Sequence, residues 1–431
     1  MKQYFKCTTI MFCIFLLTVS QSLFPQDSSD PTTVFRVKNY NKSDGLPQSS
    51  VTSIVQDDLG FMWFGTFSGI ARWDGKEFRT YLDKNSSVDT SVIHCLFVDH
   101  RGELWAGTNS RGILRFNRKK DRFEPFLLND ILERTISQGF SVYSISESSD
   151  GVLWIGTDGQ GTFSVSNDRT LQQHYLDEET VESVLVLDDG TVLFGVTGKG
   201  LYYLSNKAGM IQFSQINAFL SSDYRLREII DISVYNGDIW LGTQGGLVKL
   251  ASVNSSKAAV FSSQNSGFST DTIRSLFISE ENQLYTAVLG SGIYKFNDAS
   301  SSFTKISLEG PGIPGTVDRY LYTMYQTRSG IFWIGAVVQG VFMHYQLWTH
   351  FTLADGIDTL SQNLIPQAAE SYDNNIYVSS SSVPLFRMNT EKQNTDIEIL
   401  LTNQNSVLKD NQIWSITETA DGTVYLGGGS G

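Results

Sequence analysis

A short repeat, an aromatic residue followed closely by glycine, recurs from residue 63 almost to the end of the chain. The repeats, two of them degenerate, are Trp63/Gly65, Trp105/Gly107, Trp154/Gly156, Phe194/Gly195, Trp240/Gly242, Tyr285/Ala287, Trp333/Gly335, Tyr377/Ser379 and Tyr425/Gly427. Successive aromatic residues are 40 to 49 residues apart. This period is the length of one four-stranded blade of a β-propeller rather than that of a helical repeat. Nine such units account for most of the chain.

Each unit contains four short stretches of strand-forming residues, shown best by the first unit. Its stretches, rich in β-branched and aromatic residues, are 51–56, 61–66, 69–73 and 78–82. Asp58-Leu59-Gly60 separates the first two and Asp74-Gly75 the last two, and such residues accept the backbone conformations of tight hairpins. The 37 glycines against only 8 prolines are consistent with many short turns. The sequence therefore predicts an all-β fold.

The seventh unit indicates how many blades close the ring. It offers only three strands, at 320–326, 331–336 and 341–345. Residues 34–37 resemble an outermost strand that has no blade of its own, so we expect them to complete the seventh blade and remove its open edge. We therefore predict a seven-bladed β-propeller over residues 34–347. A new lead-in follows, and we expect residues 348–431 to be the start of a second, incomplete propeller of about two blades.

A two-bladed remnant cannot close into a ring. We therefore expect the chain to be the N-terminal portion of a longer protein or the product of a truncated gene. The terminal run 427–431 falls in register with the repeat, which favours a blade strand over a linker or a phosphate loop. We expect residues 348–431 alone to be poorly stable, because their sheets lack neighbours that bury both faces.

Residues 1–25 have the order of an export signal peptide. Two lysines precede the apolar run 9–19, and the small residues 20–22 suit cleavage. The apolar run is short for a membrane span, although an uncleaved anchor or a buried N-terminal strand is the alternative. Removal of this segment leaves Cys95 as the last cysteine, so we expect no intrachain disulfide.

Charge and motif content exclude several classes of function. The net charge of −13 opposes binding to a phosphate backbone, so nucleic acid is not an expected partner. The five histidines show no metal-ligand spacing, and we expect neither a metal nor a cofactor. His94 and Cys95 are neighbours on a predicted strand and point to opposite faces, which opposes a shared metal site. Nucleophile-elbow, nucleotide-loop, kinase and cyclase motifs are missing, so we expect no enzyme activity in these residues.

The repeat also resembles a known family. Residues 51–75, VTSIVQDDLGFMWFGTFSGIARWDG, are similar to the two-component regulator propeller repeat. The preceding residues 44–50, DGLPQSS, resemble the lead-in to the first propeller of that family. The resemblance covers residues 34–431 and is best in the first, second, third, fifth and seventh units, whereas the sixth and eighth units are degenerate.

The resemblance implies the sensor region of a membrane-bound signalling receptor, on the periplasmic side of the inner membrane. It further implies a second complete propeller, a small β-domain, a transmembrane helix and an output domain outside these residues, commonly a histidine kinase and sometimes a diguanylate cyclase. Relatives often bind oligosaccharides, so we expect an oligosaccharide or another small polar ligand. The rest of the receptor chain and a second copy, in a homodimer of the full-length protein, are the expected partners.

Loops on one face of the propeller are the expected ligand site. Loops between second and third strands and loops that lead into first strands emerge on the same side of a propeller. Amide, carboxylate, guanidinium and aromatic side chains in these loops suit a polyhydroxylated ligand. The candidate residues are Phe67, Asn109, Arg111, Asp158, Gln160, Lys199, Tyr224, Arg225, Gln244, Arg319 and Gln339. The lead-in loops also contain Arg134, Gln138, Arg227, Asp318 and Tyr320.

Two other classes of function remain open on the sequence. A secreted polysaccharide lyase or hydrolase would need acid and base groups on this face, for which Asp158, Asp318 and His94 are the candidates. A protein-interaction scaffold would use the same surface to bind a protein. Turnover of glycans would indicate the enzyme, and capture of a protein without binding of a small ligand would indicate the scaffold.

Overall fold

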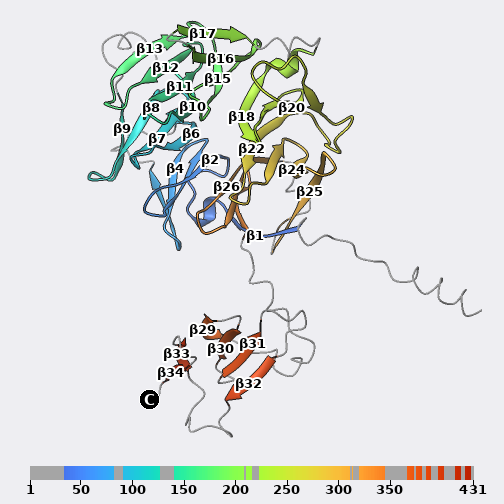
Figure 1. Ribbon diagram of the computed structural model, residues 1–431. Helices are drawn as coiled ribbons and strands as arrows, with labels where there is room; N and C mark the ends of the chain where they lie inside the picture. The colour runs from blue at the N-terminus through green and yellow to red at the C-terminus, as the bar shows by residue number, and fades with distance from the viewer. Residues whose placement is uncertain are drawn as a thin grey trace, which may run out of the picture. The chain divides into compact units, whose positions relative to one another are not determined.

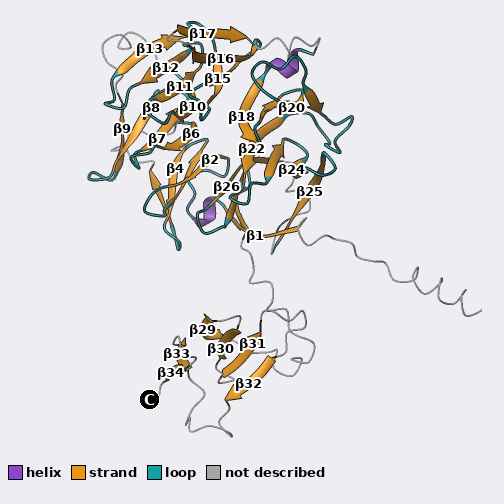
Figure 2. Cartoon of the chain, in the orientation of Figure 1, coloured by secondary structure: helices purple, strands orange, loops and turns teal. Residues whose placement is uncertain are grey.

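The computed structural model describes residues 34–81, 91–126, 140–207, 210–215, 223–310, 313, 320–344, 366–372, 375–380, 385–389, 397–401, 413–418 and 423–428. These residues are mostly β-strand, with two short 3-10 helices, η2 (Lys42–Asp44) and η4 (Tyr224–Arg227) (Figure 2). The predicted all-β fold is confirmed. The chain divides into two compact units, Met1–Tyr345 and Gln346–Gly431. The predicted signal peptide, residues 1–25, lies outside the described residues.

The described part of the first unit forms five four-stranded sheets and one eight-stranded sheet, in which β1 joins two four-stranded groups; these seven groups of four strands are here called blades 1 to 7 (Figure 1). Blades 1 to 3 are β2 (Val51–Gln56), β3 (Met62–Thr66), β4 (Gly69–Trp73), β5 (Phe78–Tyr81); β6 (Ile93–Val98), β7 (Leu104–Thr108), β8 (Ile113–Asn117), β9 (Arg122–Pro125); and β10 (Val142–Glu147), β11 (Leu153–Thr157), β12 (Thr162–Val165), β13 (Leu171–Tyr175). Blades 4 and 5 are β14 (Val181–Val186), β15 (Val192–Val196), β16 (Gly200–Lys207), β17 (Met210–Gln215); and β18 (Ile229–Tyr235), β19 (Asp238–Thr243), β20 (Gly246–Leu250), β21 (Ala259–Phe261). Blades 6 and 7 are β22 (Ile273–Ile278), β23 (Leu284–Val288), β24 (Gly292–Asn297), β25 (Ser302–Glu309); and β26 (Leu321–Gln326), β27 (Phe332–Ala336), β28 (Gly340–His344) with β1 (Val34–Tyr40).

The first strands of the blades follow one another around a ring. Each contacts the first strand of the next blade, and β26 of blade 7 contacts β2 of blade 1. This cyclic order is that of a β-propeller, with the first strands around a central channel. Strand β1 is the fourth strand of blade 7, as the sequence predicts, since Val37–Tyr40 pairs antiparallel with β28. Its first three residues also pair parallel with β25 of blade 6, so β1 joins two blades.

The hydrophobic core lies between neighbouring blades. One cluster, for example, packs Trp63 and Ile70 of blade 1 against Leu104 and Phe123 of blade 2. In six blades a glycine of the second strand permits this close packing, and blade 6 has Ala287 at this position instead. A Cβ atom added at Gly107 would lie 2.7 Å from the carbonyl oxygen of Val142 in the next blade, and one added at Gly156 would lie 2.6 Å from that of Val181. The glycine of the repeat is therefore required by the contact between blades.

The aromatic residue of the repeat holds the same register in most blades, but not in blade 4. Trp63 faces residue 55 across the β2/β3 ladder, two positions before the pair Ser53/Gly65. In blade 4, Leu193 takes the place of Trp63, and Phe194 corresponds to Phe64. The sequence alignment placed Phe194 at the tryptophan position because it is the only aromatic residue beside Gly195. That assignment was wrong by one residue.

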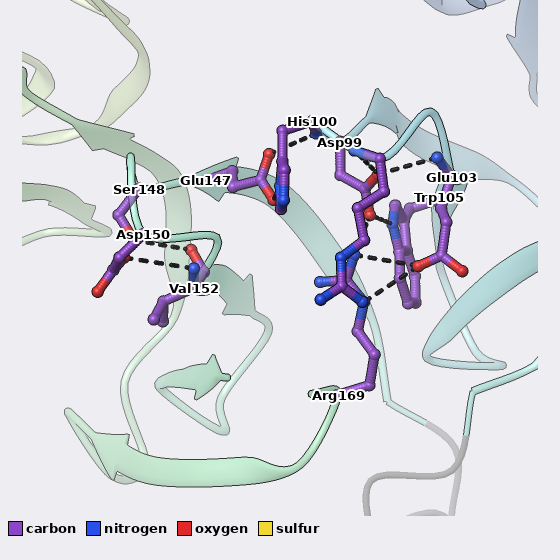
Figure 3. Close-up of polar contacts among 10 residues, drawn as sticks. Asp99, His100, Glu103, Trp105, Glu147, Ser148, Asp150, Val152 and Arg169 are labelled. Carbon is purple, nitrogen blue, oxygen red and sulfur yellow. Dashed lines mark hydrogen bonds and ion pairs between the residues drawn. The ribbon is translucent and has the colours of Figure 1, made fainter. Parts of the chain in front are cut away.

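Buried aspartates join blade 1 to blade 2 and blade 2 to blade 3. Asp99 accepts hydrogen bonds from the indole Nε1 of Trp105 at 2.8 Å and from two backbone N–H groups of its own turn. Arg169, from the β12–β13 turn of blade 3, pairs with Asp99 and donates from Nε to Glu103 at 3.0 Å (Figure 3). Asp57 repeats this arrangement, since it accepts from Trp63 at 3.0 Å and from Arg118 of blade 2 at 3.2 Å.

Other blades have different residues at the position of Asp57 and Asp99. Ser148 occupies it in blade 3, and its hydroxyl donates to the carboxylate of Asp150 and to the carbonyl of Val152 in its own turn (Figure 3). In blade 5 the hairpin is one residue shorter, and Tyr235 stands at this position. The buried Nε1 of Trp240 consequently has no hydrogen-bond partner among the described residues. The repeat thus fixes where the aromatic side chain lies, but not which group accepts a hydrogen bond from a tryptophan indole at that position.

The second unit contains four-stranded and two-stranded sheets in its described part. They are β29 (Pro366–Tyr372), β30 (Asn375–Ser380), β31 (Leu385–Asn389) and β32 (Ile397–Leu401), followed by β33 (Ile413–Glu418) and β34 (Val424–Gly428). Ser415 pairs with Gly427 after a register shift, as Cys95 pairs with Gly107 in blade 2. The strand register of the propeller repeat therefore continues into this unit.

Removal of the Asp99 carboxylate should strongly destabilise the propeller. Asp99→Ala leaves the guanidinium of Arg169 without its buried partner, and we expect a loss of about 3 kcal/mol in the free energy of unfolding. Urea denaturation measures this loss. Asp188→Ala, in an exposed turn of blade 4, is the control and should change the free energy by less than about 0.5 kcal/mol. Equal losses for the two variants would contradict the conclusion that the Asp99 carboxylate stabilises the contact between blades 2 and 3.

Two tryptophans at the same repeat position should tolerate replacement differently. Trp105→Phe removes a hydrogen bond to Asp99, whereas Trp240→Phe removes a buried donor that has no acceptor. We expect Trp240→Phe to cost at least about 1 kcal/mol less than Trp105→Phe, because the two rings are otherwise equally buried. Denaturant titration of both variants provides the comparison, and a larger cost at Trp240 would refute the expectation.

Candidate functional site

A hydrogen bond repeated in every blade places both kinds of loop on one face. The residue after each second strand donates its backbone N–H to the carbonyl of the residue directly before the first strand of the same blade. The pairs are Phe67 to Ser50, Asn109 to Val92, Asp158 to Ser141, Thr197 to Thr180, Gln244 to Glu228, Leu289 to Thr272 and Val337 to Tyr320. The two sets of loops therefore form one surface, here called the loop face, as the sequence predicts.

The described candidate residues lie in these loops. Phe67, Asn109, Arg111, Asp158, Gln160, Lys199, Gln244 and Gln339 lie between second and third strands, and Tyr224 and Arg225 lie in η4, the lead-in to blade 5. Tyr224 is 63% exposed and Phe67 is 40% exposed, so both rings are accessible on the loop face. Arg319, with Arg134, Gln138 and Asp318, lies outside the described residues.

Several candidates are held by local contacts. Lys199 pairs with Glu179, from the lead-in of the same blade. Arg225 bonds Asp223 at 2.8 Å and Asp271 at 3.2 Å, which links the lead-ins of blades 5 and 6. Such contacts order the rim of the channel, and they leave less capacity for a ligand at Lys199 and Arg225 than at Tyr224.

A ring of side chains lies directly beneath the loop face. The ladder between first and second strands shifts register at the second residue of every first strand. This β-bulge leaves one residue per blade outside the regular pairing. The seven bulge residues are Thr52, His94, Tyr143, Glu182, Ile230, Arg274 and Tyr322. We call them the channel ring, because the first strands surround the central channel.

Contacts between blades show that these side chains gather at the channel. The rings of His94 and Tyr143 lie 4.7 Å apart between centroids. The guanidinium of Arg274 lies 4.1 Å above the ring of Tyr322 and donates a hydrogen bond to its hydroxyl. Thr52 instead donates to the carbonyl of residue 93 at 2.6 Å and thereby joins blades 1 and 2. Four of the seven residues thus form two pairs across neighbouring first strands, His94 with Tyr143 and Arg274 with Tyr322.

The charged groups of the channel ring influence one another. Burial raises the pKa of Glu182, and this shift is opposed by Arg274. Burial also lowers the pKa of Arg274 and that of His94. Asp158 of the loop face acts on the same groups, because its charge raises the pKa of His94 and, after burial, that of Tyr143. Among the candidate residues predicted from the sequence, Asp158 is thus one whose charge acts on side chains of the channel ring.

Buried polar atoms without a partner concentrate at this end of the propeller. Among the described residues, four of the eight such atoms belong to the loop face or the channel ring: Thr197 Oγ1, Arg227 Nε, Arg274 Nε and Gln339 Oε1. Native proteins usually satisfy buried polar atoms with protein, water or a ligand. The loop face therefore has unused hydrogen-bonding capacity for a polar ligand.

Sequence reasoning missed most of the channel ring. It singled out His94 but not Tyr143, Glu182, Arg274 or Tyr322. The available signal was the second residue of each first strand, which is polar or aromatic in six of the seven blades, whereas the residue before it is always Val, Ile or Leu. Cys95, the neighbour of His94, lies against the next strand, and burial raises the pKa of its thiol to about 12. It is therefore a structural residue and no nucleophile.

The described residues contain neither a metal cluster nor a membrane-spanning helix. No three His, Cys, Asp or Glu side chains among them approach closely enough to hold an ion. The helices in the described ranges are single 3-10 turns, far shorter than a bilayer requires.

Three segments match the family model described as "two component regulator propeller": residues 45–68, 87–110 and 136–159. The chain contains two-component regulator propeller repeats. The segments begin in the lead-ins and end in the second-to-third loops of blades 1 to 3, so each covers one lead-in and one loop of the face. The register of the match agrees with the strands of the structure.

Solved structures share the fold. The extracellular domain assigned to the hybrid two component system BT3049 of B. thetaiotaomicron has a TM-score of 0.58 and 18% identity, covering 91% of this chain and 52% of that one. The corresponding domain of BT4673 from the same organism has a TM-score of 0.58 and 17% identity, covering 91% and 51%. Virginiamycin B lyase from Staphylococcus aureus has a TM-score of 0.54 and 12% identity, covering 72% and 98%.

A curated kinase is similar over a short stretch. Histidine kinase P4 of Formosa agariphila is 41% identical over 59 residues, which is 14% of this chain and 4% of that protein. The chain spans about half the length of the two extracellular domains from B. thetaiotaomicron. The two extracellular domains from B. thetaiotaomicron thus share the fold of this chain.

Titration of His94 tests the electrostatics of the channel ring. Asp158→Asn removes a charge that favours imidazolium, so the pKa of His94 should fall further. Arg274→Gln removes a charge that opposes imidazolium, so this pKa should rise. NMR of the imidazole signals against pH measures both shifts. His344 in β28, whose pKa is lowered by burial, is the internal control and should titrate unchanged.

Proposed function

We propose that this chain is the exported, ligand-sensing propeller region of a membrane-bound receptor of the two-component type. The ligand binds at the loop face, over the mouth of the channel. The observation that carries the proposal is the ring of half-buried polar side chains beneath this face, next to buried polar atoms that have no partner. The family match and the extracellular relatives support the signalling context.

A small polyhydroxylated molecule, such as an oligosaccharide, suits this face. Sugars present hydroxyl groups that both donate and accept hydrogen bonds, and their ring faces stack on aromatic side chains. Asp158 accepts from Thr180 at 3.0 Å on the exposed rim, and Tyr224 supplies an exposed ring. The acidic surface of the chain, with its net charge of −13, also favours a small neutral or mixed ligand over a nucleic acid.

Signal transmission requires that the ligand prefer one state of the receptor. A ligand that binds two arrangements equally well shifts no population. In the full-length protein we expect this preference to act on a homodimer, through a second propeller, a transmembrane helix and a kinase or cyclase domain. These parts follow from the family resemblance and are included in the proposal.

An enzymatic role is a second candidate on one specific observation. The charge of Asp158 raises the pKa of His94 against the lowering by burial, and an imidazole with a carboxylate in the same site is a common acid-base arrangement. A polysaccharide lyase or hydrolase at this site would turn over its ligand. Incubation of the chain with bound oligosaccharides, followed by NMR of the products, separates the two roles, because a sensor releases them unchanged.

Binding of oligosaccharides to the intact chain tests the sensor proposal. We expect members of a panel of neutral and acidic oligosaccharides to raise the melting temperature. Asp158→Asn should weaken binding about tenfold, because a charged hydrogen bond contributes about 1.5 kcal/mol or more. Lys76→Gln, in an exposed turn between third and fourth strands on the opposite face, is the control. Capture of a protein partner without any small-ligand shift would favour the interaction scaffold instead.

A further inference from the structure

Arg274 is a half-buried cation that has no counterion in contact among the described residues. Its guanidinium donates one hydrogen bond, to the hydroxyl of Tyr322, while the Nε–H is buried and unpartnered. No ion pair involving Arg274 joins it to a carboxylate among the described residues. Leaving a guanidinium desolvated and unpaired is costly, and the cost is recovered when an anion binds.

The nearest carboxylates are engaged elsewhere or held apart from Arg274. Asp231 accepts hydrogen bonds from the backbone N–H groups of Ile232 and Leu276 at 2.9 and 2.7 Å. The charge of Glu182 raises the pKa of Arg274, but the two side chains form no ion pair. The channel ring therefore carries a cation and a carboxylate that influence each other's charge but form no ion pair.

The ring of Tyr322 restricts the geometry of a ligand at Arg274. The guanidinium carbon of Arg274 lies 4.1 Å from the centroid of this ring, and Nη2 donates to the hydroxyl of Tyr322, so the remaining N–H groups of the guanidinium are those left for a ligand. A carboxylate accepts charge-assisted hydrogen bonds from a guanidinium, which are stronger than those that a neutral hydroxyl accepts. The geometry at Arg274 thus favours a carboxylate over a neutral sugar.

The remaining groups around the channel mouth favour hydroxyl groups on the same ligand. Glu182 and Asp158 accept hydrogen bonds, and Thr197 Oγ1 is buried and unpartnered. His94 and Tyr143 add neutral polar edges and ring faces. We propose that the channel ring binds a small hydroxylated carboxylate, such as a sugar acid, with its carboxylate on Arg274 and its hydroxyls toward Glu182 and Asp158. This inference rests on the proposed function and specifies the class of its ligand.

The test compares glucuronate with glucuronamide, its neutral isostere, by calorimetry on the intact chain. We expect glucuronate to bind at least tenfold more tightly than glucuronamide. Arg274→Gln should remove this preference, and Arg274→Lys, which keeps the charge but not the two-pronged geometry, should remove most of it. Arg115→Gln, an exposed arginine on the outer part of blade 2, is the matched control and should leave binding unchanged.

Glu182→Gln provides a second variant if the Arg274 variants fail to fold. It should weaken glucuronate binding while the preference over glucuronamide persists. Equal binding of glucuronate and glucuronamide would overturn the inference, as would glucuronate binding that Arg274→Gln leaves unchanged. In either case the sensor proposal would still hold if oligosaccharides bind elsewhere on the loop face. Binding of serine but not glucuronate would indicate a zwitterionic ligand instead. If neither glucuronate nor any oligosaccharide binds at millimolar concentration, both proposals fail.

Discussion

The pairing of β1 with β28 and β25 is the contact on which the ring depends. Six blades take all four strands from one continuous segment, but blade 7 takes its outer strand from the opposite end of the unit. Without β1, the ladders of blades 6 and 7 would each expose an edge, and the first strands would lose the constraint that closes the channel. Every feature of the loop face, from the repeated rim hydrogen bonds to the channel ring, requires that closure.

Most of the fold could be predicted from the sequence because the residues of the repeat make similar strand-pairing and blade-packing contacts in successive blades. The glycine after the aromatic residue marks where the next blade approaches, and Val34–Val37 could be recognised as an outer strand from its pattern alone. Phe194 shows where this reasoning fails, since blade 4 places a leucine at the tryptophan position. The sequence also did not predict the ion pairs of Asp57 and Asp99, because the arginines that pair with these aspartates come from turns of the following blade.

The candidate site could be predicted only in outline. Loop composition predicted a ligand face, and the structure shows that both kinds of loop lie on it and that Asp158 acts on the side chains of the channel ring. The channel ring required the structure, because one residue from each of seven distant segments contributes, and no single segment carries a recognisable motif. Arg274 illustrates the difficulty: its surroundings come from blades 4, 5 and 7, and only their spatial arrangement shows that its charge lacks a partner.

The β-bulge in each first strand has a consequence for how such proteins diversify. The bulged residue is excluded from the regular ladder, so its side chain can change without breaking a strand pair. Seven such positions converge on one channel, and each belongs to a different blade. A propeller of this kind can therefore acquire a new ligand preference by independent single substitutions, while the contacts that keep it folded stay as they are.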